Sequence, residues 1–229
     1  MQPIQISRRS LLLFSGGLVG GWLISSCRQA TSTPQKTIFI SKPKSPISKQ
    51  QTTEHTADSL PIEIATIFQS GQTPNNVFTE LMPAVVEALQ CDRTFLYIRD
   101  PQRQRTSITH GYSRDNRWPT MVQSGWSDES PSLNAKDPLT ASAYKSPEAK
   151  FIDDIETAAP DTLDLAMERA IFGHRALVHA PIYYEGIFYG IVEPCVFDKP
   201  RIWSERDLTL ITTLQSQLGS WIVRYLANL

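Results

Sequence analysis

The stretch RALVHAPIYYEGIFYGIVEPCVF, residues 175–197, decides the fold of this chain. Two runs rich in apolar and aromatic residues, 175–184 and 187–197, flank the turn dipeptide Glu185-Gly186, which predicts a β-hairpin. The chain then enters a helix that Ser204 can cap. The apolar residues of this helix recur three or four positions apart and define one buried face: Leu208, Ile211, Leu214, Leu218, Trp221, Ile222 and Tyr225.

A second hairpin is predicted upstream. Residues 93–99 and 105–112 read as strands on either side of a turn that begins at Asp100-Pro101. Residues 113–174 then form a crossover between the two hairpins. We expect its parts to be, in order, a polar loop (113–136), a short helix (138–145), an extended piece (Phe151-Ile152) and a second helix (161–170).

Two further helices precede the first hairpin. Asp58 or Ser59 can cap the first of them, with Pro61 in its first turn. The second begins at Pro74 and places four apolar residues in register, and Pro83 within it predicts a kink or a restart. The four residues are Phe78, Leu81, Val85 and Leu89.

This order of elements predicts an α+β fold around a central antiparallel sheet of about six strands, because strands joined by hairpins run antiparallel. The N-terminal and C-terminal helices should pack together on one face of the sheet. The other face is left for the helices and loops of the crossover. We assign residues 58–229 to this single domain.

The N-terminus has the features of an export signal. Arg8-Arg9 precede an apolar stretch, residues 11–24, that glycines keep only mildly hydrophobic, and Cys27 follows. The arginine pair resembles a twin-arginine signal, and the residues ending at Cys27 resemble a bacterial lipobox, in which that thiol is lipidated. We therefore expect residues 1–27 to be the signal and the body to lie outside the plasma membrane, in the periplasm or thylakoid lumen, anchored by lipid. The alternative is an uncut membrane anchor.

Charge divides the chain at the same place. Residues 1–57 carry seven basic side chains and one acidic one, whereas residues 58–229 carry 15 basic and 22 acidic side chains. An acidic body argues against nucleic-acid binding, which requires a basic face.

Residues 28–57 are rich in Ser, Thr, Lys and Pro, so we expect a flexible linker there. No apolar run is long enough for a multi-pass membrane protein.

Four segments resemble the GAF domain family, over roughly residues 60–227. Residues 89–93 match the entry to the first strand, 175–182 the fifth strand, 190–192 the sixth strand, and 200–205 the entry to the last helix. The resemblance is to cyanobacterial GAF domains near those of phytochromes and cyanobacteriochromes. It implies a small-molecule pocket under the crossover, which family members use for bilins, cyclic nucleotides or small metabolites, although some members only dimerise.

The chromophore positions of the photoreceptor relatives differ in this chain. By a gap-free count, the bilin-attaching Cys falls on Asp164, with Leu165 in place of the following His. A second Cys position falls on Leu139, and a pocket His falls on Cys195. We therefore expect no covalently attached bilin, and no other cofactor is indicated.

Six side chains in or beside the crossover are candidates to line a ligand pocket, because such a pocket needs aromatic walls and a few polar anchors. Trp126 and Tyr144 would alternatively pack the loop onto the sheet. Arg175 would alternatively form a salt bridge with Asp153 or Asp154. The six candidates are Trp126, Asp137, Tyr144, Asp164, Arg175 and His179.

Catalysis and metal binding are not indicated. Cys91 and Cys195 offer no recycling thiol pair, and we expect them to be neighbours at adjacent strand ends, more often as free thiols than as a disulfide. His174 and His179 are five residues apart, which on a strand would place them on opposite faces and prevent chelation. The acidic run at 153–156 is expected to be solvated or to cap a helix.

Two functions remain open. The first is a tethered sensor that binds a small molecule and signals through a partner protein. The second is a ligand-free scaffold for dimerisation or protein binding, with Trp221 and Tyr225 of the last helix in a bundle between subunits rather than in the core.

Overall fold

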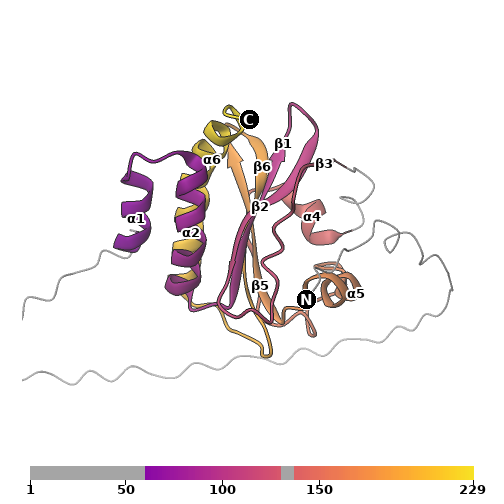
Figure 1. The fold of residues 1–229 in the computed structure, drawn as a ribbon. Helices are drawn as coiled ribbons and strands as arrows, with labels where there is room; N and C mark the ends of the chain where they lie inside the picture. The colour runs from indigo at the N-terminus through magenta and orange to yellow at the C-terminus, as the bar shows by residue number, and fades with distance from the viewer. Residues whose placement is uncertain (1–59, 130–136) are drawn as a thin grey trace, which may run out of the picture. The chain divides into compact units, whose positions relative to one another are not determined.

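The computed structural model describes residues 60–129 and 137–229, which contain a six-stranded antiparallel sheet with helices on both faces (Figure 1). The strand order is β3-β2-β1-β6-β5-β4. The predicted α+β architecture is confirmed. In chain order the strands are β1 (Arg93–Asp100), β2 (Arg105–Ser113), β3 (Ser127–Asp128), β4 (Lys150–Ile152), β5 (Ala176–Tyr184) and β6 (Ile187–Val196).

The two predicted hairpins lie side by side because β1 pairs with β6. In this pairing Arg93 is opposite Cys195 and Phe95 is opposite Glu193. The hairpin β5–β6 places Leu177 opposite Cys195. The segments that the sequence separates most, the first strand and the last, therefore form the centre of the sheet.

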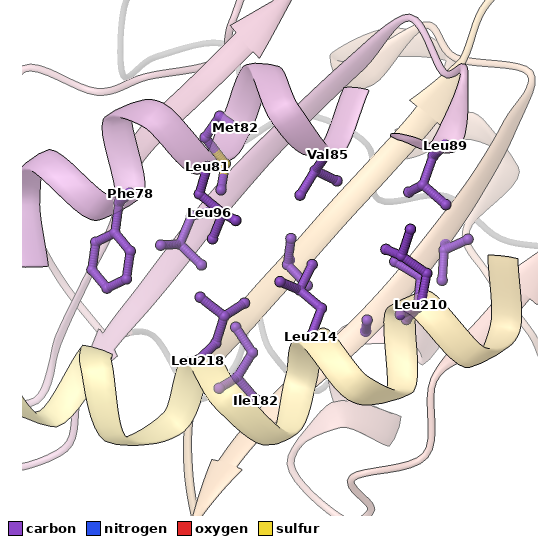
Figure 2. Close-up of a cluster of buried hydrophobic side chains, with 14 of the residues drawn as sticks. Phe78, Leu81, Met82, Val85, Leu89, Leu96, Ile182, Leu210, Leu214 and Leu218 are labelled. Atoms are coloured by element: carbon purple, nitrogen blue, oxygen red, sulfur yellow. The ribbon is translucent and has the colours of Figure 1, made fainter. Parts of the chain in front are cut away.

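One face of the sheet is covered by α2 (Pro74–Leu89) and α6 (Glu205–Leu226), and α1 (Ile62–Gln69) packs on the outer side of α2. Figure 2 shows how α2 and α6 point their apolar side chains at each other and at the strands. Leu96 of β1 and Ile182 of β5 meet this layer and are fully buried. The helix side chains in view are Phe78, Leu81, Met82, Val85 and Leu89 of α2, and Leu210, Leu214 and Leu218 of α6.

The helix starts follow local capping chemistry. Ser204 caps α6 as predicted, and together with Asp207 it forms a capping box. The helix α1 begins at Ile62, after Pro61, with no side-chain cap, and the expected caps Asp58 and Ser59 lie outside the described residues. Thr73 caps α2.

Of the kink or restart predicted at Pro83, the restart is wrong, because α2 is one helix from Pro74 to Leu89. Proline in a helix interior costs a hydrogen bond. The face of α2 from Val77 to Leu89 is buried against the sheet and α6, and this packing stabilises the helix across the proline.

The crossover covers the opposite face of the sheet with α4 (Pro138–Ala143), α5 (Leu165–Met167) and η1 (Glu168–Phe172), a π-helical turn (Figure 1). The helix expected at 161–170 begins later, because the Asp164 side chain caps α5 by accepting a hydrogen bond from the Met167 amide. A second apolar cluster lies on this face and includes Leu139, Leu177 and Phe197.

The predicted signal (1–27), the predicted linker (28–57) and Cys27 lie outside the described residues. Among the helices that the structure describes, none is both long and apolar enough to cross a membrane.

Candidate functional site: a buried charged cluster on the crossover face

Charged side chains line the centre of the sheet on the face that the crossover covers. Arg93 of β1, His179 of β5 and Glu193 of β6 are 0%, 4% and 5% exposed. The register places Phe95 opposite Glu193, two residues from the Arg93–Cys195 pair, so these side chains share one face. Such residues are seldom this buried unless they are paired, so their presence needs an explanation.

Two histidine–glutamate pairs hold this face together. Nδ1 of His179 lies 2.8 Å from Oε2 of Glu193, and Nε2 of His174 lies 2.8 Å from Oε2 of Glu168. Glu168 comes from η1, which ends at Gly173 in the left-handed conformation with φ 68°. This turn brings His174 back beside Glu168. We call Arg93, Glu168, His174, His179 and Glu193 the central cluster.

The two carboxylates of the central cluster differ in their electrostatic surroundings. Burial raises the pKa of Glu168, and the nearby carboxylates of Glu193 and Asp137 raise it further, against the effect of His174. Burial would also raise the pKa of Glu193. The hydrogen bond and charge of His179, together with His174 and Arg93, outweigh it and bring that pKa below its ordinary value.

Aromatic rings enclose the Arg93 guanidinium. Its central carbon lies 4.8 Å from the centre of the Phe197 ring and 5.7 Å from that of Phe95. Phe172 stacks between Phe95 and His174, with ring centres 6.1 Å and 5.5 Å away. This packing gives the central cluster apolar walls and fixes the positions of the arginine and of His174.

Three nitrogens of the central cluster make no hydrogen bond to any described residue: Arg93 Nε, His174 Nδ1 and His179 Nε2. The other Arg93 nitrogens donate to main-chain oxygens, Nη1 to Pro119 at 3.1 Å and Nη2 to Phe172 at 3.5 Å. Buried polar atoms in native proteins nearly always have a partner, either in the protein, in ordered water or in a ligand. Three such atoms within one cluster mark a candidate binding site.

Two of the six predicted site residues lie at the central cluster. His179 is a member of it. Asp137 is buried beside it, close enough to affect Glu168, but its oxygens cap α4 by accepting hydrogen bonds from Leu139 and Thr140.

The other four candidates lie elsewhere. Tyr144 donates its hydroxyl to Glu129 and lies against Phe188. Trp126 lies under the Arg105 guanidinium at 4.6 Å. Asp164 caps α5, and Arg175 forms a two-contact salt bridge with Asp154 at 2.5 and 2.8 Å, which was the alternative expected for it. Their roles in ligand binding stay predictions.

The prediction that His174 and His179 face opposite ways is wrong. Both lie near Glu193 and affect its pKa. The alternation of a strand does not extend to His174, because β5 begins at Ala176 and the left-handed turn at Gly173 redirects the chain before it.

Sequence reasoning missed Arg93, Glu168, His174 and Glu193 as site residues. Glu193 could have been found, because it interrupts the apolar run of β6, where a charged side chain is unexpected. Glu168 could not, because its burial depends on how η1 packs on the sheet.

The acidic run at 153–156 is not simply solvated. Asp154 pairs with Arg175 and Glu156 pairs with Arg169. Oδ1 of Asp153 accepts a hydrogen bond from the Trp203 amide. Asp153 and Asp154 therefore tie the crossover to the rest of the domain, and Glu156 joins two parts of the crossover.

No group of three or more His, Cys, Asp or Glu in residues 60–129 and 137–229 could hold a metal ion. The two described cysteines, Cys91 and Cys195, are buried free thiols. The amide of Asp92, next to Cys91, donates to the carbonyl oxygen of Cys195 at 3.0 Å, so the two cysteines lie at adjacent strand ends as predicted.

A family model for the GAF domain matches residues 73–221, so the chain belongs to the GAF family. Members of this family are generally regulatory modules that sense or bind small molecules rather than enzymes. No curated protein matches the chain at a significant level.

Solved structures show the same fold at low identity. The GAF domain of an Acinetobacter phosphoenolpyruvate-protein phosphotransferase is 15% identical, with a TM-score of 0.53 over 72% of this chain and 93% of its own. The phycoerythrobilin-bound GAF domain of a cyanobacterial phytochrome is 16% identical, with a TM-score of 0.56 over 70% and 90%. The cyanobacteriochrome TePixJ GAF domain is 19% identical, with a TM-score of 0.53 over 71% and 96%.

Proposed function

We propose that this GAF domain is a non-catalytic sensor that binds a small molecule at the central cluster. The structural change caused by binding is passed to a partner protein by contact. The observation that carries the proposal is the set of three buried nitrogens without a partner on the crossover face. Members of this fold bind small molecules, and a bound ligand would supply the hydrogen-bond partners that these buried atoms lack beside the aromatic walls.

The crossover offers a route by which binding could reach the surface. Arg93 donates to Pro119 in the 113–126 segment and to Phe172 at the end of η1. A ligand that moved the guanidinium would therefore disturb two surface segments at once. A partner that contacts either segment would read the change.

The alternative function is a ligand-free scaffold for dimerisation or protein binding. The observation that favours it is the burial of the central cluster, since its five residues are already between 0% and 5% exposed. The terminal helices do not favour it, because Trp221 is 7% exposed and packs in the core, and Tyr225 packs against Phe78.

Native mass spectrometry of the chain purified from its own host separates these two functions. A retained small molecule, lost when His179 and Glu193 are both replaced by Leu, supports the sensor. The scaffold is supported if folded protein that still binds a partner has the mass of the chain alone, or of a dimer, with no added ligand.

We further propose that the domain is exported and tethered at the outer side of the membrane. The support is in the sequence: Arg8-Arg9, a weakly hydrophobic stretch and Cys27. Replacing both arginines with Lys should leave the precursor in the cytoplasm, and labelled fatty acid should be incorporated into the chain but not into a Cys27→Ser variant. Unchanged fractionation of the double Lys variant contradicts the export route.

A further inference from the structure

We propose that Arg93 Nε, His174 Nδ1 and His179 Nε2 together bind one singly charged carboxylate, either as a free ion or as the acid group of a larger molecule. This inference rests on the proposed function and names the class of its ligand. It is argued from the hydrogen-bonding roles of these three atoms and from the charge of the groups around them.

All three nitrogens act as donors. Arg93 Nε always carries a hydrogen. For the histidines, a glutamate occupies the other ring nitrogen, Nε2 of His174 and Nδ1 of His179. Consider a pair that has gained one proton relative to an ionised carboxylate beside a neutral imidazole. If that proton is on the ring, the pair is a salt bridge and both ring nitrogens carry hydrogens. If it is on the carboxyl group, the acid donates to one ring nitrogen and the other, unpartnered nitrogen carries the ring hydrogen.

Burial favours that protonated form of each pair. A pair without the extra proton has a net charge of −1, and an uncompensated charge is costly at side chains that are 5% exposed or less. The two carboxyl groups differ in where that proton lies: the pKa of Glu168 is raised, so loss of its proton is opposed, whereas the hydrogen bond and charge of His179 lower the pKa of Glu193. The unpartnered atoms are then three N–H groups, whose complement is an acceptor oxygen.

The charge of the central cluster fits a monoanion. Each protonated histidine–glutamate pair is neutral, so Arg93 leaves a net charge of +1. Of the other ionisable groups nearby, the Asp137 carboxylate lies outside the cluster and is compensated at the N-terminus of α4, where it accepts three hydrogen bonds. Burial raises the pKa of the Cys195 thiol, which keeps it neutral. One carboxylate would neutralise the cluster and accept the free hydrogens, whereas a cation would meet like charge.

The experiment uses the full chain with 15N-labelled histidine. Formate serves as the free ion, benzoate as the acid group of a larger planar molecule, and chloride at equal ionic strength as the salt control. We expect saturable shifts of the His174 and His179 ring nitrogens with formate, benzoate or both. His110 lies on the helix-covered face and should not respond. Tighter binding of benzoate than of formate identifies a larger acid, and the reverse identifies a free ion.

Two variants test the assignment without leaving a buried charge unpaired. One replaces His179 and Glu193 by Leu, and the other replaces His174 and Glu168 by Leu. Each removes one donor but keeps the net charge, so each should weaken carboxylate binding about tenfold or more, given the strength of hydrogen bonds to charged groups. The matched control is His110→Gln, which should bind as the wild type does.

The inference is overturned if neither acid shifts the ring nitrogens of the wild-type chain saturably, if chloride produces the same shifts, or if both paired variants bind as tightly as the control. Since the first two readouts use the unmodified chain, they hold even if a variant fails to fold. A retained ligand without an acid group, found by native mass spectrometry, would also overturn this inference while leaving the proposed sensor function intact.

Discussion

His110 differs from the histidines of the central cluster in having no charged partner. It lies between the rings of Phe78 and Tyr225, with ring centres 5.3 and 5.7 Å away. Its ring nitrogens lie 2.9 Å from Thr109 Oγ1 and 3.2 Å from Asn75 Oδ1. Burial lowers its pKa to about 4, and the hydrogen bonding at Asn75 opposes this only in part.

This pKa makes His110 a source of acid sensitivity in the folded domain. Between pH 6.5 and 4 the unfolded chain binds the proton and the folded chain does not, so the free energy of unfolding falls as the pH falls through this window. The contribution is complete above the unfolded pKa. Between pH 7.5 and 4.5, we expect the free energy of unfolding of His110→Gln to fall by about 2–3 kcal/mol less than that of the wild type.

Urea unfolding of both proteins at the two pH values measures this difference, and the carboxylates common to both cancel in it. An equal fall in the free energy of unfolding of the two proteins would show that His110 is protonated in the folded state over this pH range.

The two described cysteines are predicted to be unreactive in the native domain. Cys91 packs in the core under the helices, and Cys195 packs in the cluster on the crossover face, so their side chains belong to different layers. Burial raises the pKa of Cys91 to about 12 and also raises that of Cys195. The thiolate is the reactive form, so neither thiol should react at pH 8.

A chain with Cys27→Ser isolates these two thiols. An aromatic disulfide reagent should label none of them in buffer and both in denaturant. Finding no thiol in denaturant without reductant would show instead that a disulfide had formed.

At the level of single residues, the sequence predicted packing better than it predicted the site. Glu185-Gly186, Ser204 and the apolar register of the last helix follow from local chemistry, and the structure has them in those roles. The central cluster joins residues from β1, η1, β5 and β6 that are up to 100 positions apart. Only the tertiary packing decides which polar groups lose their water there.

The helix α6 approaches β5 closely at one glycine. A Cβ atom at Gly219 would lie 2.6 Å from the carbonyl oxygen of Tyr183 and 3.0 Å from Cβ of Tyr184. Both contacts are shorter than side chains normally allow, and the closer one is to backbone, which cannot rotate away. Glycine at this position sets the distance between the helix and the sheet.

We therefore predict that Gly219→Ala lowers the free energy of unfolding by about 1–3 kcal/mol, although alanine is the better helix former. Ser216→Ala, at an exposed position of the same helix, is the control and should change stability by less than about 0.5 kcal/mol. Urea unfolding curves give both values. Equal stability of the two variants would mean that α6 can shift without loss.

The element boundaries show where local signals are outweighed. Pro83 predicts a kink or a restart, and no restart occurs, because the buried face of α2 continues across it. The helix predicted from Asp161 instead begins after Asp164, whose carboxylate caps it, and ends as a π-helical turn. Periodicity identifies that a helix exists, whereas a specific side-chain hydrogen bond decides where it begins.

At the scale of the whole molecule, the two faces of the sheet have different roles. The helix-covered face is almost entirely apolar and contains the larger core. The crossover face combines a smaller apolar cluster with the buried charges of the central cluster. A domain that needed only stability would gain by replacing such charges with apolar groups, so their position in one layer is an argument for binding.

The last prediction concerns the bilins that several structurally similar GAF domains hold. A covalent bilin requires a thiolate directed at the chromophore, and the positions that would supply one carry Asp164, which caps α5, and Leu139, which is 2% exposed in the crossover cluster. Cys195 is a buried thiol of raised pKa.

We therefore predict that the chain forms no thioether when co-expressed with bilin-synthesising enzymes. Denaturing electrophoresis with zinc fluorescence should show no band at its mass, beside a fluorescent cyanobacterial phytochrome GAF domain from the same cells. A band that persists in the Cys27→Ser chain would show that a buried cysteine becomes accessible, and that the crossover opens far more than its packing implies.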